Sequence, residues 1–466
     1  MLKSLICANK HIFIVFYFII FGYTIDKISR GKIEYLIIYI CTCLPIYTTL
    51  QAQAFKIFNT EIVVAIIKLS KDIIFIYAFI IFLFGKNIHL FKRIFKFSLV
   101  DKLILIFTLI VTIYALIPLG EADIFSKLIY AKNLYIISIT YLIGRNIKID
   151  EVFFNSIKKI LKYLILSLTF FLCFEFILST HFHSIIDFSN YNILVNEIDP
   201  QGNYGLSWSF ESQGSSPRYA AFFADPLELS ASLLLLTSLL IYNFWNNKRN
   251  ISYFLLFMVA AAFLFSFSRG AIVACIGIVL FGLLLNKKYK FLLLIFGLFL
   301  LSTLSLIYFG SEEIRYFIID TLKFENTSSL GHLVEWIEGI LSIFENPLGI
   351  GLAMSGNASG VDQAIKVGGE NQFLIFGVQM GVLSIITYVL ILFFVIKRSC
   401  KVYYLSSNND KHISFIVACT KFGLLLPLLT ANAELYLFVS LTTWFFAGYI
   451  ESRYTQLKFE KNKSLY

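Results

Sequence analysis

Apolar runs of roughly 15 to 25 residues recur along the chain between His11 and Ile450, and short charged segments separate them. Wound as a helix, a run of this length crosses or nearly crosses the ~30 Å hydrocarbon core of a bilayer. Backbone polar groups inside a bilayer must be hydrogen-bonded within the protein, and helices meet this requirement. The pattern therefore predicts an all-α polytopic membrane protein with about 12 or 13 transmembrane helices.

The composition supports the same class. Of the 466 residues, 58% are hydrophobic and only 15% are charged, which is too apolar for an ordinary soluble protein. We find no internal repeat and no soluble segment, so residues 1–466 are expected to form a single membrane domain. The seven cysteines fall in apolar runs or short basic loops, and this placement predicts no disulfide framework and no cysteine metal site.

The net charge of +10 is distributed as small basic groups between apolar runs, for example at residues 145–159, 287–290 and 397–401. Nucleic-acid binding would need a continuous basic face, so we expect no nucleic-acid partner. Basic loops of multi-pass proteins face the cytoplasm. The charge pattern therefore predicts that these loops are cytoplasmic, and that the loops alternating with them lie on the outer side.

The outer segments are then the short loop at residues 120–126, two long loops at residues 180–225 and 310–370, and the short turn Ala431–Glu434. Three groups of polar residues lie in or beside these loops. Since chemistry in a membrane protein needs polar groups at an accessible surface, we expect the functional site on this side.

Two arginines are candidates for anion binding. Arg218 precedes a helix expected to begin near Pro226, so its guanidinium can lie at the membrane surface and bind a phosphate with two hydrogen bonds. Arg269, in the segment SFSRGA, lies at the outer boundary between two apolar runs, where a positive charge favours an anionic lipid-linked substrate. The alternatives are an Arg218 that reaches lipid headgroups and an Arg269 that pairs with a helix C-terminus or with Glu175.

The second outer loop contains the segment GHLVEW. His332 and Glu335 are spaced to share one face of an amphipathic helix, beside Trp336. His332 can act as a base near neutral pH, with Glu335 orienting it. The alternative is a histidine that caps the helix or lies at the interface.

A glycine-containing segment, NPLGIGLAMSG, follows. Pro347 is expected to end the helix, and Gly349, Gly351 and Gly356 would let backbone amides approach a ligand closely.

The next apolar run begins with polar residues. Glu370, Asn371 and Gln372 stand at its outer mouth, and Gln379 lies two turns deeper. Polar residues that enter a membrane helix tend to face a cavity rather than lipid.

These segments, in this order, resemble the bacterial O-antigen ligase/polymerase superfamily, which includes the Wzy-type polymerases and the WaaL-type ligases. The resemblance rests on the stretch Arg218–Pro226, on SxSRGA at Ser266–Ala271, and on GH-x3-W, NPLGIGL and ENQF-x3-GVQ-x-G within Gly331–Gly381. It covers the C-terminal half of the chain, and the N-terminal half matches only in hydropathy.

The resemblance implies a fold like that of the C-type glycosyltransferases, in the bacterial cytoplasmic (inner) membrane, with a groove between the outer loops and the bilayer. It implies an undecaprenyl-diphosphate-linked glycan as donor, no nucleotide sugar, no cofactor and no essential metal ion. A chain-length regulator would be a further partner. Arg218 and Arg269 would bind the diphosphate and stabilise its charge as it leaves.

The substrate would also contact four residues, namely Asn371, Gln372, Gln379 and Trp336. Many relatives carry Arg where His332 stands, and His-Asn where Glu370-Asn371 stands. The base that deprotonates the acceptor hydroxyl is therefore either Glu370 or His332.

Three other readings remain. A ligase differs from a polymerase in its acceptor, which is lipid A core or a protein instead of another lipid-linked repeat unit. The divergent N-terminal half favours a polymerase. A flippase for the same lipid is disfavoured, because flippases usually have short loops. A metal-dependent transferase would need an acidic pair such as Glu121 and Asp123 to hold a divalent cation.

Overall fold

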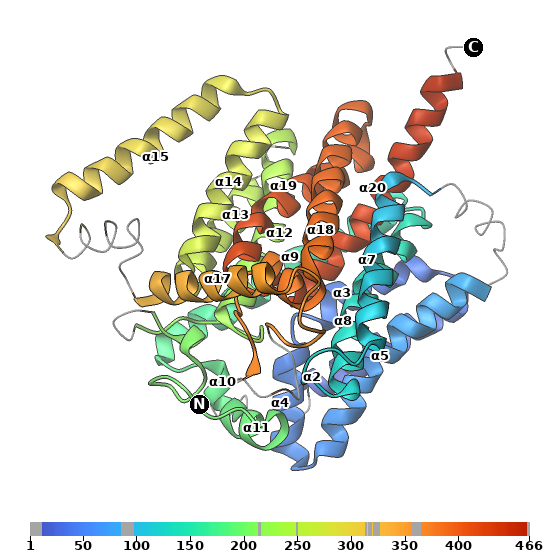
Figure 1. Ribbon diagram of the computed structural model, residues 1–466. Helices are drawn as coiled ribbons and strands as arrows, with labels where there is room; N and C mark the ends of the chain where they lie inside the picture. Colours follow the sequence, from blue (N-terminus) through green and yellow to red (C-terminus); the bar gives the residue numbers. More distant parts are fainter. Residues whose placement is uncertain are drawn as a thin grey trace.

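The computed structural model describes residues 12–84, 97–212, 216–247, 250–312, 327–356 and 365–463, together with residues 315, 319 and 361. Within these residues all regular structure is helical, apart from one isolated bridge between Glu211 and Pro217 (Figure 1). This confirms the all-α prediction. The α-helices are α2 (Ile12–Ser29), α3 (Leu36–Cys43), α4 (Tyr47–Phe58), α5 (Glu61–Phe84), α7 (Leu99–Leu116), α8 (Ile124–Arg145), α9 (Glu151–Leu178), α10 (Phe182–Ile185), α11 (Phe188–Asn196), α12 (Pro226–Asn247), α13 (Asn250–Ser266), α14 (Arg269–Leu285), α15 (Tyr289–Phe309), α17 (Thr327–Glu345), α18 (Gln372–Leu405), α19 (Asn408–Thr430) and α20 (Leu437–Lys463).

Short 3₁₀ helices complete the described structure: η1 (Ile33–Tyr35), η3 (Trp208–Phe210) and η5 (Ala433–Leu435). Six helices, α7, α9, α12, α15, α18 and α19, are long and apolar enough to cross a membrane. A seventh span is possible if the segment containing η1 and α3 is combined with α4, from which it is bent by 65°. The chain is thus a multi-pass membrane protein. The larger number of 12 or 13 spans stays a prediction.

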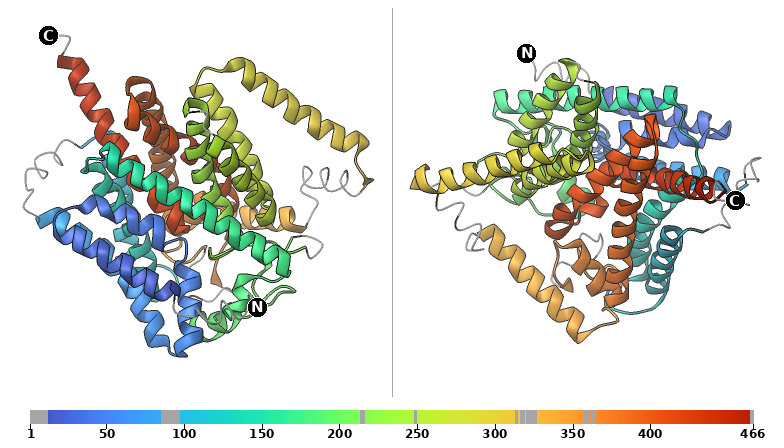
Figure 2. Two further views of the ribbon diagram at one scale, coloured as in Figure 1. Left: turned by 180° about the vertical axis from the view of Figure 1, so that it is seen from behind. Right: turned by 90° about the horizontal axis from the view of Figure 1, so that it is seen from above.

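The upright helices α7, α8, α12–α14 and α18–α20 form the body of the molecule, and α17 runs across one end of it (Figures 1 and 2). Small residues allow the closest helix contact, between α8 and α20. A Cβ on Gly144 would lie 2.0 Å from the carbonyl oxygen of Phe445, and one on Gly448 would lie 2.1 Å from that of Tyr141. Gly is therefore required at both positions for this packing. In contrast, α15 stands away from the body and has no buried residue.

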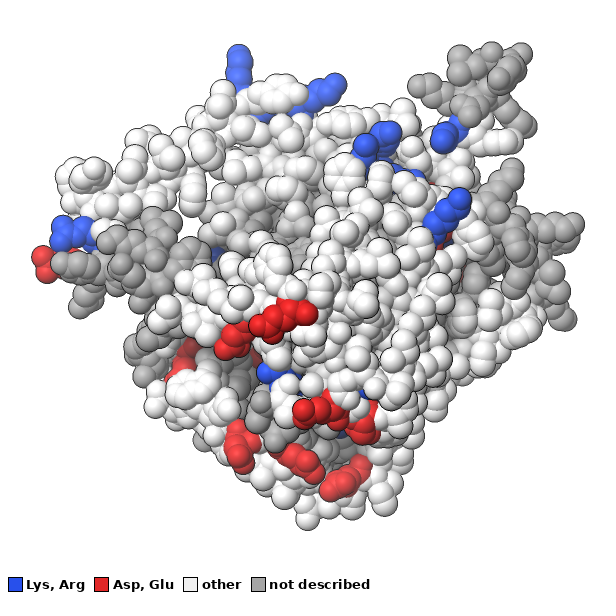
Figure 3. All heavy atoms as spheres, viewed as in Figure 1, with Lys and Arg blue, Asp and Glu red and all other residues white. Residues whose placement is uncertain are grey.

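The connections that carry the candidate residues meet at one end of the body. They are the segment with α10 and α11, the segment with α17, and the η5 turn. On the face seen in Figure 3, Asp and Glu gather toward this end, and most Lys and Arg lie toward the end where the chain finishes. Glu175 fastens the first connection, because its carboxylate accepts hydrogen bonds from the backbone N–H of Phe182 (2.8 Å) and of Ala221 (2.9 Å).

Candidate functional site

Arg218 lies in the connection that leads into α12, which begins at Pro226 as expected. Its Nε donates a hydrogen bond to the carbonyl oxygen of Ser266 (3.0 Å), the last residue of α13. The end of a helix carries unpaired carbonyl groups and a partial negative charge, so this contact fixes the guanidinium at the α13–α14 turn. This hydrogen bond therefore places the segment that contains Arg218 next to the segment Ser266–Ala271, which contains Arg269.

Arg269 is the first residue of α14. The turn before it is tight, since α13 ends at Ser266 and Phe267 adopts a left-handed conformation (φ 44°) that non-glycine residues rarely take. A positive side chain at a helix N-terminus is opposed by the helix dipole. Arg269 and the α14 N-terminus therefore form a positive region that suits an anion.

His332, on α17, is paired with Glu370. Its Nδ1 lies 2.7 Å from Glu370 Oε2, and the two side chains are 26% and 47% exposed. The hydrogen bond with Glu370 raises the pKa of His332 above its ordinary value, while burial acts in the opposite direction. The expected partner of His332 was Glu335, which lies one turn along α17. The structure corrects this, because the imidazole bonds to the carboxylate at the mouth of α18.

Glu335 and Trp336 lie close behind this pair. Oε2 of Glu335 is buried and has no hydrogen-bond partner among the described residues, and the same holds for Nε1 of Trp336. Burial raises the pKa of Glu335, and the nearby charge of Glu370 raises it further.

The candidate residues at the start of α18 have different surroundings. Asn371 caps the helix, since its Oδ1 accepts hydrogen bonds from the backbone N–H of Phe373 (3.0 Å) and Leu374 (3.3 Å). Gln372 is fully buried, and its Oε1 accepts a hydrogen bond from the backbone N–H of Glu434 (3.2 Å). Its Nε2 has no partner in the described part of the chain.

Gln379 and the glycine segment hold each other in place. Nε2 of Gln379 donates to the carbonyl oxygen of Ser355 (2.6 Å), and its Oε1 accepts from the N–H of Ala353 (3.3 Å). Gln379 is fully buried. Its amide therefore supports the loop, contrary to the expectation that it faces a cavity.

The three glycines have positive φ, as glycine readily allows, but they serve protein contacts. A Cβ on Gly349 would lie 2.7 Å from the carbonyl oxygen of Gln379, and one on Gly351 would lie 2.2 Å from that of Leu119. Gly356 has φ 71°. These glycines let the backbone approach α18 and the α7–α8 connection closely. The expectation from the sequence was a close approach to a ligand instead.

The acidic pair considered for a metal ion is not arranged as a site. Asp123 caps α8, and its carboxylate accepts hydrogen bonds from the N–H of Phe125 (3.0 Å) and Ser126 (3.3 Å). Among the described residues, one group could supply three metal ligands: His332, Glu335 and Glu370, whose ligand atoms lie within 4.8 Å of one another. In this group the imidazole and the Glu370 carboxylate are already hydrogen-bonded to each other.

The charges of the three segments act on one another. Burial lowers the pKa of Arg218, Asp225 raises it, and the charge of Arg269 lowers it. Arg269 also opposes protonation of His332. Two arginines and a histidine–carboxylate pair therefore share one end of the molecule. Such a site can bind an anion and take a proton from a nearby hydroxyl group.

The sequence analysis did not identify Asp225, Glu434 or Tyr436 as candidate residues. Asp225 and Tyr436 act electrostatically on Arg218, and Glu434 is hydrogen-bonded to Gln372. Asp225 caps α12 through the N–H of Leu227 and Glu228 (2.7 Å each). The pattern Asp225-x-x-Glu228 is a recognisable capping signal. An acidic residue in an otherwise apolar stretch, such as Glu434, is also a signal that sequence reasoning can use.

Comparison with known proteins supports the resemblance found in the sequence. Residues 253–389 match a family model described as O-antigen ligase, and this match covers under a third of the chain. The matched segment runs from α13 into α18. It includes Arg269, His332 and Glu370, whereas Arg218 and the η5 turn lie outside it. No curated protein matches the chain.

Proposed function

We propose that this multi-pass membrane protein of the O-antigen ligase/polymerase superfamily polymerises undecaprenyl-diphosphate-linked repeat units into a surface polysaccharide at the outer face of the cytoplasmic membrane. The observation that carries the proposal is the meeting of Arg218 and Arg269 with the His332–Glu370 pair at one end of the helical body. These four residues come from four separate segments of the chain.

The proposed transfer breaks the bond between the sugar anomeric carbon and the diphosphate of the donor. The acceptor hydroxyl oxygen forms a new bond to that carbon, and its proton passes to the base. The bonding electrons leave with the diphosphate, whose growing negative charge Arg218 and Arg269 stabilise. Charge stabilisation of this kind is usually the largest contribution to such a rate enhancement.

His332 is the base in this scheme. With Nδ1–H donated to Glu370, its Nε2 is left to accept the proton of the acceptor hydroxyl, and the carboxylate then stabilises the imidazolium. Glu370 is the positioning carboxylate.

The scheme needs no metal ion, because the two arginines supply positive charge at the diphosphate. Glycan formation that persists in EDTA would support this part of the proposal. Loss of activity in EDTA, with recovery on adding a divalent cation, would instead assign the His332, Glu335 and Glu370 group to metal binding.

The ligase is the second candidate, favoured by the description of the matching family model. The glycan ladder of a deletion strain separates the two. Core carrying a single repeat unit would establish the polymerase, and bare core with accumulated lipid-linked polymer would establish the ligase.

The same strain tests the diphosphate site. We expect complementation by Arg218→Ala or Arg269→Ala to fail, because each substitution removes a charge that the leaving group requires. Arg30→Ala is the matched control, since Arg30 is exposed and pairs only locally with Asp26 (2.8 Å). An unchanged ladder with either variant at normal protein level would exclude that arginine from diphosphate binding.

A further inference from the structure

The turn between α19 and α20, Ala431–Tyr436, and the helix ends next to it lie against several of the segments that form the proposed site. On the α19 side, a Cβ on Gly270 would lie 3.8 Å from Oγ1 of Thr430, which places the end of α19 beside the start of α14. On the α20 side, the ring of Phe438 packs against Phe223 with centroids 6.1 Å apart. Phe223 belongs to the segment that joins Arg218 to α12.

The middle of the turn reaches the second outer loop. The N–H of Glu434 donates to Oε1 of Gln372 at the mouth of α18 (3.2 Å). The amide of Asn432 lies against Gly356, where an added Cβ would come within 3.0 Å of Nδ2. The turn and the helix ends on either side of it, residues 430–438, therefore lie against the start of α14, the connection before α12, the glycine segment and α18.

A buried polar network fixes the conformation of this turn. The carboxylate of Glu434 accepts hydrogen bonds from Ser440 Oγ (2.9 Å), from the indole N–H of Trp444 and from the hydroxyl of Tyr388. Nζ of Lys421 lies 4.0 Å from Glu434 Oε1 and 3.8 Å from the centre of the Trp444 ring. The side chains of Lys421 and Glu434 are only 1% and 3% exposed.

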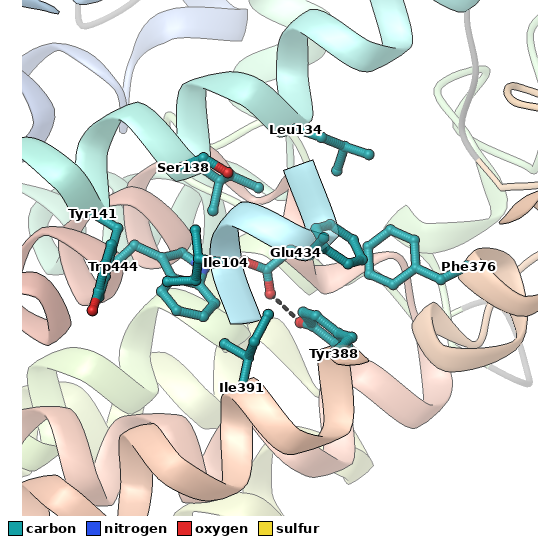
Figure 4. A pocket seen from close by; sticks show the side chains of 11 residues that line it. Ile104, Leu134, Ser138, Tyr141, Phe376, Tyr388, Ile391, Glu434 and Trp444 are labelled. Carbon is teal, nitrogen blue, oxygen red and sulfur yellow. Dashed lines mark hydrogen bonds between the residues drawn. The ribbon is translucent and has the colours of Figure 1, made fainter. Parts of the chain in front are cut away.

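Figure 4 shows how Glu434 is enclosed. Its carboxylate borders a cavity of about 30 Å³ whose walls are mostly apolar side chains, including Phe376, Ile104 and Leu134. An ion pair in apolar surroundings is costly unless its polar groups are satisfied, and removal of one partner is strongly destabilising. This network therefore holds the turn in one conformation. It also fixes the position of Tyr436, which lies two residues after Glu434.

Tyr436, at the end of this turn, interacts electrostatically with charged groups of the proposed site. The groups that act electrostatically on its hydroxyl are Asp225, Glu228, Glu370 and Arg218. Burial raises the pKa of the phenol most, and the negative charge of Asp225 raises it further, so the hydroxyl keeps its proton and can donate a hydrogen bond.

We propose that the Ala431–Tyr436 turn is a further wall of the site, in which the Tyr436 hydroxyl donates a hydrogen bond to the diphosphate of the lipid-linked donor and Glu434 positions the turn. The inference rests on the proposed function, because it takes a lipid diphosphate as the ligand. Tyr436 adds a neutral donor next to Arg218, where the charge on the leaving diphosphate increases as the glycosidic bond breaks.

The test uses the full-length protein in nanodiscs and geranylgeranyl diphosphate as the probe. A hydrogen bond to a charged group is worth about 1.5–3 kcal/mol, so we expect Tyr436→Phe to bind the probe more weakly, with a Kd raised by about 10-fold to 100-fold. Binding of geranylgeraniol, which lacks the diphosphate, should not change. Tyr449→Phe is the matched control, since Tyr449 donates to Asp410 (2.5 Å) near the start of α19, at the opposite end of that helix from the turn. An unchanged Kd in Tyr436→Phe would overturn the contact.

The positioning role has its own variant. Glu434→Gln alone leaves Lys421 buried without a countercharge, so the double variant Lys421→Met/Glu434→Gln is used to preserve folding. We expect a protein with a cooperative thermal transition but weakened binding of the diphosphate probe. A folded double variant with the wild-type Kd would remove Glu434 from the proposal.

The outcomes also separate this inference from the proposed function. Wild-type protein that binds the diphosphate but forms no glycan in a reconstituted assay would refute glycan transfer and leave the Tyr436 contact standing. Wild-type protein that binds no diphosphate would refute both. Wild-type protein that does both, together with an unaffected Tyr436→Phe variant, would refute the inference alone.

Discussion

The imidazole of His332, on α17, and the carboxylate of Glu370, in the segment just before α18, are brought together at a distance of 2.7 Å. At the residue scale this contact assigns the role of base to His332 and the role of positioning carboxylate to Glu370. The hydrogen bond occupies one ring nitrogen of His332 and leaves the other for the substrate. It also raises the pKa of the imidazole above 6.5. Only the neutral imidazole can accept a proton, so the pair predicts a characteristic dependence of activity on pH.

We expect the rate of glycan transfer to rise with pH through this raised pKa and then to level off. In Glu370→Gln the carboxylate charge is lost and the pKa of His332 falls, so the midpoint of the profile should move to lower pH. At pH values above this pKa, where the wild-type imidazole is neutral, His332→Ala should reduce the rate by about 100-fold or more, which is the usual contribution of a general base. Initial rates in buffers of constant ionic strength provide the measurement.

Glu338→Gln is the control for this series, because Glu338 is an exposed acid on the same helix. A profile that stays in place in Glu370→Gln would show that the two residues are not coupled. Full activity in His332→Ala would transfer the role of base to Glu370.

At the scale of the element, α18 shows how a helix is bent to hold a loop. Its backbone departs from helical geometry at Gly381 (φ 75°, ψ 178°). Next to this kink, the N–H of Val382 donates to the carbonyl oxygen of Pro347 (3.0 Å), and the N–H of Ile350 donates to that of Val378 (2.8 Å). The kink thus attaches the segment after α17 to α18, and it fixes α17 relative to the mouth of α18.

Substitution of Gly381 by Ala should therefore destabilise the protein. The added Cβ would lie 2.5 Å from the carbonyl oxygen of Pro347, in a backbone conformation that favours glycine. A strained position of this kind costs about 1–3 kcal/mol, so we expect a lower Tm and a parallel loss of activity. Gly297→Ala, in α15 with nothing within 4 Å, should leave both unchanged or slightly raise the Tm. Equal Tm values for the two variants would contradict this account of the kink.

On the scale of the whole molecule, the segments with α10, α11, α17 and η5 share one end, and the chain finishes at the other (Figure 1). The charge distribution follows this division, with acidic side chains gathered at the first end (Figure 3). The positive-inside rule therefore predicts that the end with the proposed site faces outward.

Cysteine labelling tests this orientation. In a background without the native cysteines, Glu338→Cys on α17 should react with a membrane-impermeant maleimide in intact cells, because this position is exposed at the outer end. Lys290→Cys, exposed at the start of α15, should react only after the membrane is made permeable. The reverse pattern would place the site on the cytoplasmic side, where the outer-leaflet reaction proposed above could not occur.

By itself, the sequence determined the all-α membrane class, the resemblance to a known family and the segments that carry polar chemistry, because each of these depends on local patterns such as the length of apolar runs and the spacing of motif residues. Arg218 and the start of α12 at Pro226, the helix break between Ser266 and Arg269, and the helix with His332 and Glu335 were all located in this way. Only the tertiary structure decided which polar groups meet. The choice of Glu370 over Glu335 as the partner of His332, the use of Gln379 to hold a loop, and the place of the η5 turn all depend on contacts between distant segments. Such contacts follow from how the helices pack, and the hydrophobic pattern of one segment contains no information about its neighbours in space.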